Sequence, residues 1–196
     1  MKLLLVSDQV HDALYKHFEK KRWQDIDLIL SAGDLPANYL SFLVTMIDGV
    51  PLYYVRGNHD DDYQQKPPLG CQNLHGKIVT YRGLTIMGLE GSNWYNGQGI
   101  QYRERTMKWR VFKLLPRILF RKKIDIIITH APPYGCYPVD KPAHKGFKIF
   151  RYLIDKLQPA YFIHGHFHLS YGRQKRIIEY NRTKVINAYQ YYQLEI

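Results

Sequence analysis

Short apolar runs that end next to Asp, Asn or His recur along the chain. Each run is rich in Leu, Ile, Val or Tyr and is bounded by Gly, Pro or polar residues, a pattern typical of strands buried on both faces. The runs are Lys2–Val6, Ile26–Leu30, Leu52–Val55, Ile124–Thr129 and Tyr161–Ile163. Ligands in open α/β sheets bind outside the carboxyl ends of the strands, so we expect the polar residues to gather on one rim.

Helical spacing of apolar residues separates several of these runs. It predicts helices at Asp12–Lys20, Ala37–Ile47 and Phe147–Leu157. Alternation of strand and helix indicates a largely parallel sheet with crossover helices. Further strands in hairpin-like succession are predicted at Lys77–Tyr81, Leu84–Leu89, Tyr171–Tyr180, Lys184–Asn187 and Tyr191–Leu194. The pattern as a whole predicts an α/β fold with two packed sheets and helices outside.

Length and composition indicate one ordinary globular domain covering residues 1–196. The chain has 196 residues, with 45% apolar and 23% charged residues, which excludes a disordered protein. Its two cysteines, Cys71 and Cys136, are far apart and lack a metal-binding spacing, which favours free thiols in a reducing compartment. The first apolar run is too short for a signal peptide, so we expect a cytoplasmic protein.

The net charge of +11 is concentrated in one segment. Between Arg103 and Lys123 there are nine Lys or Arg and one acid, Glu104, a local balance of +8 that leaves only +3 for the rest. A local basic element of this kind favours an anionic partner.

The same segment predicts an amphipathic helical insert at about residues 101–123. Apolar residues at helical spacing should pack on the domain, and Pro116 should kink or divide the helix. Trp109, Phe112 and Phe120 fall partly off that stripe, among basic residues. Such a helix fits an anionic membrane surface, which would make the protein peripheral at a membrane, or nucleic acid phosphates. A simple solvated face is the third interpretation.

The residues after the strands suit divalent cations. Carboxylate, amide oxygen and imidazole are ligands for Mn²⁺, Fe or Zn²⁺. Two cations about 3.5–4 Å apart can share a carboxylate and a hydroxide and hold both oxygens of an in-line displacement. Glycines that let the backbone turn tightly behind the metals are expected in such a site, and Gly33, Gly57 and Gly165 occupy suitable positions.

Four motifs in order resemble the calcineurin-like metallophosphoesterase family. They are Gly33-Asp34, Gly57-Asn58-His59-Asp60, Thr129-His130-Ala131-Pro132-Pro133 and Gly165-His166-Phe167-His168, each after a predicted strand. The resemblance runs from Asp8 to His168, most of the chain. It implies a four-layer α/β/β/α sandwich, with two packed mixed sheets flanked by helices.

The resemblance also implies roles for individual residues. Asp34 would bridge two divalent metal ions, with Mn²⁺ favoured and Fe or Zn²⁺ as alternatives. Asp8 and His168 would bind the first metal, and Asn58, His130 and His166 the second. His59 would act on the substrate, by stabilising phosphoryl charge or protonating the leaving oxygen, and Asp60 would orient His59.

One departure concerns the first metal. The family's first motif is Asp-x-His, whereas this chain has Asp8-Gln9-Val10-His11. Val10 cannot coordinate a metal, and His11 comes one position late, so the first-metal site is expected to be weaker. His11 is an alternative ligand if the turn after Asp8 brings it round. His144 lies in a loop expected to approach the metal rim, as a substrate contact or as part of a helix start.

These features predict a phosphoester hydrolase. A metal-bridging hydroxide would attack a phosphomonoester or a phosphodiester, and nucleotides, nucleic acids, lipid-linked phosphates and phosphoproteins are all substrates in this family. Two alternatives stay open at this point. Val10 favours a non-catalytic interaction scaffold on the same fold, and the basic segment favours a metal-dependent nuclease.

Overall fold

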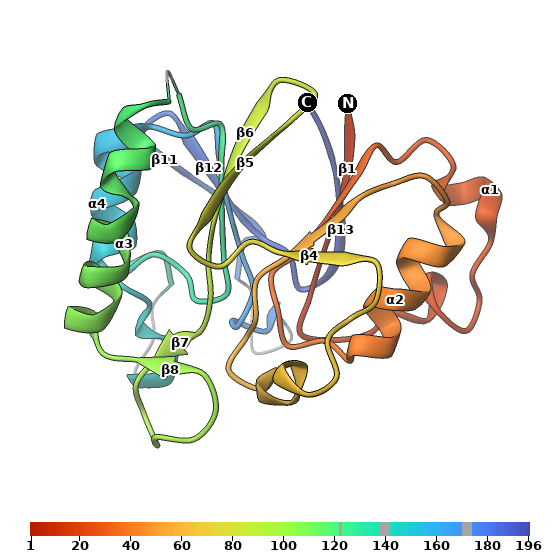
Figure 1. The fold of residues 1–196 in the computed structure, drawn as a ribbon, viewed down its shortest axis with the longest axis horizontal. Coiled ribbons are helices and arrows are strands. Elements are labelled where there is room, and N and C mark those ends of the chain that lie inside the picture. Colours follow the sequence, from red (N-terminus) through yellow and green to blue (C-terminus); the bar gives the residue numbers. More distant parts are fainter. Residues whose placement is uncertain (122, 138–141, 170–173) are drawn as a thin grey trace.

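The computed structural model describes residues 1–121, 123–137, 142–169 and 174–196. Two large mixed sheets form its centre (Figure 1). The first sheet has the order β13-β1-β2-β3-β4, in which β13 is antiparallel to β1 and the other neighbours are parallel. Its strands are β1 (Lys2–Ser7), β2 (Leu28–Ser31), β3 (Leu52–Tyr54), β4 (Cys71–Asn73) and β13 (Gln190–Glu195).

The second sheet has the order β11-β12-β10-β9-β6-β5. Its inner neighbours are parallel, and β11 and β5 are antiparallel edge strands. Its strands are β5 (Lys77–Tyr81), β6 (Leu84–Leu89), β9 (Ile126–Thr129), β10 (Tyr161–His164), β11 (Ile177–Tyr180) and β12 (Thr183–Asn187). A small two-stranded pair, β7 (Ser92–Asn93) with β8 (Gln101–Tyr102), follows β6.

Helices cover the outer face of each sheet, as Figure 1 shows. The first sheet carries α1 (Lys20–Trp23) and α2 (Ala37–Met46), and the second carries α3 (Glu104–Leu119) and α4 (Lys148–Leu157). Short 3₁₀ helices complete the described elements: η1 (Asp12–Leu14), η2 (Asp61–Gln64) and η3 (Pro142–Lys145). The result is the expected four-layer α/β/β/α sandwich, so the predicted fold class is confirmed.

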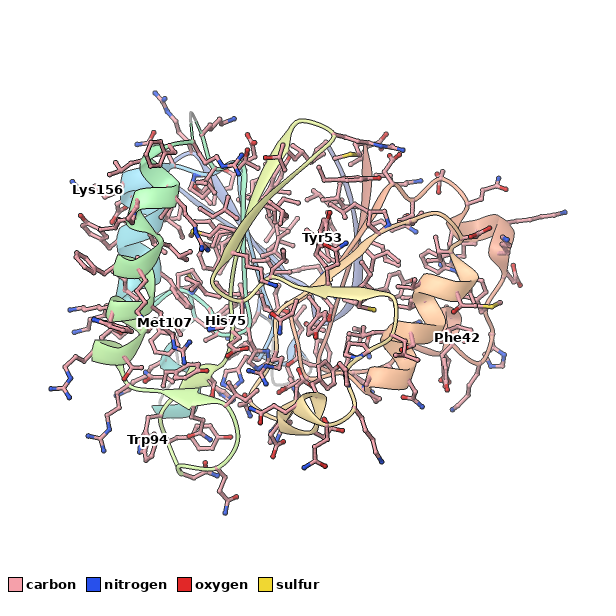
Figure 2. The ribbon with its side chains drawn as sticks, in the orientation of Figure 1. Phe42, Tyr53, His75, Trp94, Met107 and Lys156 are labelled. Atoms are coloured by element: carbon pink, nitrogen blue, oxygen red, sulfur yellow. The ribbon has the colours of Figure 1, made fainter. Side chains whose placement is uncertain are left out.

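Three apolar clusters hold the four layers together. One lies between the sheets and contains Leu5, Leu30 and Ile163, with Tyr53 at the centre of Figure 2. A second joins the second sheet to α3 and α4 and contains Met107 and Phe150, and the third lies under α1 and α2. Because the central strands are covered on both sides, their sequences are continuously apolar rather than alternating.

Four local predictions need correction. A single helix over Asp12–Lys20 is wrong: η1 and α1 are separate short turns, because the residues between them are mostly exposed and form no apolar stripe. The edge strand β4, with its polar sequence, was not predicted. The strand predicted over Tyr171–Tyr180 is β11, Ile177–Tyr180, and residues 171–173 lie outside the described residues. The helix in the basic segment is not divided at Pro116, since α3 continues to Leu119.

Candidate metal centre

The carboxyl ends of five strands, from both sheets, bring the predicted ligands to one rim. In the first sheet, Asp8 follows β1, Asp34 follows β2 and Asn58 follows β3. In the second sheet, His130 follows β9 and His166 follows β10. The parallel pairing of β1, β2 and β3, and of β9 and β10, aligns these ends side by side. The strand-end pattern in the sequence therefore predicted the place of the site.

Asp34, His130 and His166 form its centre, with ligand atoms that all lie within 4.8 Å of one another. His130 Nε2 lies 3.0 Å from His166 Nδ1, 3.3 Å from Asp34 Oδ2 and 3.0 Å from Asn58 Oδ1. Convergence of four ligand atoms from four separate strand ends is compatible with the binding of a cation. The donor set of carboxylate, amide oxygen and imidazole fits Mn²⁺, Fe or Zn²⁺.

His130 is held in the orientation that a ligand needs. Its Nδ1 lies 2.8 Å from the carbonyl oxygen of Ala32, and its side chain is fully buried. An Nδ1–H donated to a backbone carbonyl leaves the Nε2 lone pair directed at Asp34, Asn58 and a cation.

Asp8 and His168 lie beside this centre, where the first metal is expected. Both Asp8 carboxylate oxygens accept the His166 backbone N–H, at 2.9 and 3.1 Å, and His168 Nε2 lies 3.7 Å from Asp8 Oδ1. The His168 ring stacks on Tyr189, whose hydroxyl donates to Gln9 Oε1 at 2.5 Å. Asp8 thus connects the residues expected to bind the first metal to the backbone of the loop that carries His166.

Three of the candidate ligands have left-handed backbone conformations. Asp8 has a φ of 63°, Asp34 56° and His166 64°. Residues other than glycine rarely adopt this region, and such strain is concentrated at functional sites, where the surrounding structure enforces it. The observation supports a site in which side-chain direction is fixed at a cost in backbone energy.

Two glycines allow the backbone to pass closely behind Asp34. A Cβ on Gly57 would lie 2.0 Å from Asp34 Oδ1, and a Cβ on Gly33, which has a φ of 93°, would lie 2.3 Å from the Gly57 nitrogen. No side chain fits at either position. Both are among the glycines expected from the sequence to let the backbone turn tightly behind the metals.

Asp60 and His59 have different surroundings. Asp60 is buried, and its Oδ2 accepts the backbone N–H groups of Asp34 and Gly57, both at 2.7 Å. These bonds position the metal-binding loops rather than the His59 ring, so they give Asp60 a role that the sequence did not predict. His59 is exposed at the rim, and its backbone N–H donates to Asp34 Oδ1 at 2.8 Å. Its side chain is accessible to a substrate.

Electrostatics couple Asp34 to its neighbours. Burial raises the pKa of Asp34, but the adjacent His130 outweighs this and holds the pKa well below its ordinary value. Burial lowers the pKa of His130, whereas Asp34 raises it more strongly, to about 9. Burial, with the nearby Asp34 charge, raises the pKa of Asp60 to about 7. A cation in the centre would take the place of the proton on His130 and neutralise the concentrated carboxylate charge.

Val10 and His11 point to other partners. Val10 packs against the apolar cluster under α1 and α2. His11 Nδ1 accepts the Ala13 N–H at 3.2 Å and so caps η1, and its ring meets the edge of Tyr191 at 4.7 Å. Neither residue joins Asp8 and His168, the two predicted first-metal ligands that lie beside the centre.

The His144 loop does approach the rim. The His144 ring lies edge-on to His166, with centroids 5.4 Å apart, and 5.6 Å from the Phe167 ring. A role for His144 in substrate contact stays a prediction.

Tyr95 is a neighbour of the site that the sequence did not indicate. Its hydroxyl accepts from Asn58 Nδ2 at 3.2 Å, so the Asn58 oxygen faces His130. The Gln101 side chain fixes the loop that carries Tyr95, because its Oε1 accepts the backbone N–H groups of residues 95–97. Tyr95 and Asn58 are 37 residues apart in the sequence, so no local motif reveals their contact.

Fold and site together define the class: an α/β/β/α protein with a metal-binding group at the strand ends where its two sheets meet. Residues 1–170 match the profile of the calcineurin-like phosphoesterases, and the chain belongs to this family. The family resemblance stated from the four motifs is therefore confirmed.

Curated relatives and solved structures agree with this assignment. The chain is 27% identical to the UPF0046 protein K07C11.7 of Caenorhabditis elegans, over 97% of this chain and 70% of the relative. It is 29% identical to human metallophosphoesterase domain-containing protein 1, over 60% of this chain and 34% of the relative, so the match spans about a third of that protein. The crystal structure of TT1561 of Thermus thermophilus superposes with a TM-score of 0.66, at 18% identity over 95% of this chain and 88% of that one. At this identity the superposition shows the fold alone.

Proposed function

We propose that the protein is a metal-dependent hydrolase of phosphomonoesters or phosphodiesters. The observation that carries the proposal is the convergence of Asp34, His130 and His166 within 4.8 Å. Two divalent cations bound there would hold the phosphoryl oxygens, supply a hydroxide nucleophile and neutralise developing charge. Mn²⁺ is the cation that we favour.

The chain's own residues would divide the work as follows. Asp34 would hold both cations, Asn58, His130 and His166 the second, and Asp8 and His168 the first. The exposed His59 ring would donate a proton to the leaving oxygen or a hydrogen bond to the phosphoryl group. Asp60, through its bonds to the Asp34 and Gly57 backbone, would keep the two metal-binding loops in register.

The test is Mn²⁺-dependent hydrolysis of a chromogenic phosphomonoester and a chromogenic phosphodiester. Asp34→Asn should lose turnover by at least about a thousandfold, because it removes the bridging charge. Asp61→Asn is the matched control: Asp61 is an exposed carboxylate in η2, three positions from Asn58, and its variant should keep wild-type rates. Undiminished activity of Asp34→Asn would exclude the proposed mechanism, and the ester preference of the wild type narrows the substrate.

A second candidate function is an interaction scaffold on the same fold. The observation that favours it is the packing of Val10 in the apolar cluster, which leaves the first-metal half without the family's histidine. A scaffold has no chemical need for the second-metal cluster or for an exposed His59. Absence of turnover on either ester, with Mn²⁺ bound at one site by calorimetry, would favour the scaffold. Cleavage of oligonucleotides, with salt-sensitive binding, would instead identify a nuclease.

A further inference from the structure

The outer side of α3 carries an unusual number of exposed apolar side chains. Trp109 is 57% exposed, Phe112 65%, Leu119 82% and Phe120, directly after the helix, 90%. Isolated exposed apolar residues are ordinary on a protein surface, but a contiguous group of large ones marks an interaction site.

Three stripes run along α3. Its buried stripe consists of Met107, Val111, Leu114 and Ile118 and packs on the second sheet; Figure 2 shows Met107 on the inner side of the helix. The second stripe, apolar and exposed, contains Trp109, Phe112, Leu115 and Leu119. The third is basic and lies toward β5: Arg117 donates to the carbonyl of Gly76, just before that strand, and Arg121, just after the helix, donates to Thr80 Oγ1. An amphipathic surface helix needs only the first stripe to fold, so the second is available to a partner.

The apolar stripe continues onto α4. An open groove of about 710 Å³ lies between the two helices, with Phe112 and Leu115 on one side and Ile149 and Tyr152 on the other. Tyr152 is itself 52% exposed. The surface is therefore formed by two packed helices with fixed geometry, and we refer to it as the α3–α4 face.

Positive charge surrounds this face. Arg105 and Lys108 border the groove, and Lys113 Nζ lies 3.5 Å from the centre of the Trp109 ring. Glu104 is the one acid of α3, against five basic residues in the helix, and its carboxylate accepts the Lys148 and Ile149 N–H groups at the start of α4. The helix therefore keeps a net positive charge.

We propose that the α3–α4 face docks on an anionic lipid bilayer. Aromatic and aliphatic side chains would enter the boundary between headgroups and acyl chains, and the basic residues around them would meet anionic headgroups. A second copy of the chain is a poorer occupant, since it would bring two basic faces together. Nucleic acid is poorer too, because its phosphates match the basic stripe and its bases can stack on aromatic rings, but neither gives a partner to the aliphatic Leu115 and Leu119.

Such docking would be peripheral. None of the helices in the described part of the chain is both long and apolar enough to cross a bilayer. The start of α3 lies at the same end of the molecule as the metal centre, since the loop before it carries Tyr95, which contacts Asn58, and Trp94, labelled in Figure 2. The bilayer would thus lie beside the site. The proposal does not depend on the site being catalytic.

Vesicle binding of the full chain tests the proposal. We expect cosedimentation with phosphatidylcholine vesicles that contain about a third phosphatidylglycerol, weakened by salt, and none with phosphatidylcholine alone. Leu119→Ser with Phe120→Ser should lower the partition coefficient by about tenfold or more. Leu69→Ser is the matched control for the first change, because Leu69 is 76% exposed on a loop far from this face, and it should bind as the wild type does.

Charge variants separate the two contributions. Arg105→Gln with Lys108→Gln should lower partitioning onto the anionic vesicles by about tenfold or more, whereas Lys20→Gln with Lys21→Gln, an exposed pair in α1, should change it little. Unchanged thermal midpoints would show that all variants fold. Failure of the wild type to bind anionic vesicles, or equal binding by Leu119→Ser/Phe120→Ser, would overturn the proposal. Concentration-dependent dimers without vesicle binding, dispersed by that same variant, would overturn it in favour of self-association.

Discussion

At the metal centre, the Asp34 carboxylate is positioned both by the close backbone of Gly57 and by the polar groups that it contacts. Gly57 passes so close to Asp34 that an added Cβ would lie 2.0 Å from Oδ1 and 2.5 Å from Cγ. The same carboxylate accepts the His59 N–H and approaches His130. Because these distances are far shorter than van der Waals contact, a single methyl group on Gly57 must displace the Asp34 carboxylate.

Gly57→Ala should therefore weaken metal binding. We expect the affinity for Mn²⁺ to fall by at least about tenfold, because the displaced carboxylate no longer faces His130 and His166. Isothermal titration calorimetry measures this directly, without reference to turnover. Gly49→Ala is the control: a Cβ there meets no atom within 4 Å, although the φ of 75° costs stability. Equal Mn²⁺ affinity in Gly57→Ala and the wild type would contradict the close approach.

The positions of these side chains could be predicted where a single local feature of the sequence indicated them. Asp34, Asn58, His130 and His166 each follow an apolar run, and the carboxyl ends of such strands in an α/β sheet share one rim. The neighbourhood of Asp8 was harder to predict, because the turn after β1 decides whether Val10 or His11 faces the site. The structure turns Val10 into the cluster under α1 and α2 and uses His11 as a helix cap.

Helix ends illustrate how elements depend on one another. Phe147, at the N-terminal end of α4, makes no side-chain capping bond. The Glu104 carboxylate, from the first turn of α3, accepts the Lys148 N–H at 3.0 Å and the Ile149 N–H at 2.9 Å instead. A negative charge at this position also interacts favourably with the dipole of α4.

Glu104→Ala should lower the free energy of unfolding by about 1–2 kcal/mol, since it leaves two N–H groups of α4 without their acceptor. Urea denaturation of the variant and the wild type measures the difference. Glu19→Ala provides the control, because Glu19 stands at the N-terminus of α1, is exposed and makes no capping bond. A loss no larger than that of Glu19→Ala would show that water replaces the carboxylate without cost.

Helices and strands could be predicted from the sequence where their apolar residues recur at a regular spacing or form a continuous run. α2, α4, β5 and β6 coincide closely with the expected segments because each has a clear apolar face or run. The predicted helix over Asp12–Lys20 was wrong because its segment packs through few side chains, so tertiary contacts decide its conformation. Pro116 lies one turn from the end of α3, where the loss of one hydrogen bond does not divide the helix.

At the scale of the whole molecule, a buried polar cluster ties both sheets to α3. Arg56, after β3, donates to both Glu90 carboxylate oxygens, at 2.8 and 3.1 Å, and Tyr102 donates to Oε1 at 2.8 Å. His75 completes the cluster between Glu90 and Arg110, whose Nη1 lies 2.5 Å from His75 Nε2. Its Arg56–Glu90 and His75–Arg110 contacts join residues 34 and 35 positions apart in the sequence, so the local patterns that predicted the layers gave no indication of the cluster.

This cluster should make the stability of the protein depend on pH. Burial, together with Arg110, Arg56 and Lys77, lowers the pKa of His75 to about 4, against the opposite effect of Glu90. An unfolded histidine has a pKa of about 6.5, so between about pH 6.5 and 4 the unfolded chain binds a proton that the folded chain does not. The free energy of unfolding therefore falls as the pH falls through this window, by a few kcal/mol from His75 alone.

His75→Gln should remove that contribution, and urea denaturation between pH 7.5 and 4.5 would show it. We expect a shallower decline with falling pH than in the wild type, whatever the variant's stability at neutral pH, because the remaining histidines titrate in both proteins. Glu90 does not imitate the effect: its pKa lies below the ordinary value for glutamate, so its contribution is lost only at still lower pH. His17→Gln, at an exposed histidine, should keep the wild-type decline. Parallel curves for His75→Gln and the wild type would mean that His75 gains its proton in the folded protein as readily as in the unfolded chain. The junction between the sheets would then have to accommodate an imidazolium beside Arg110.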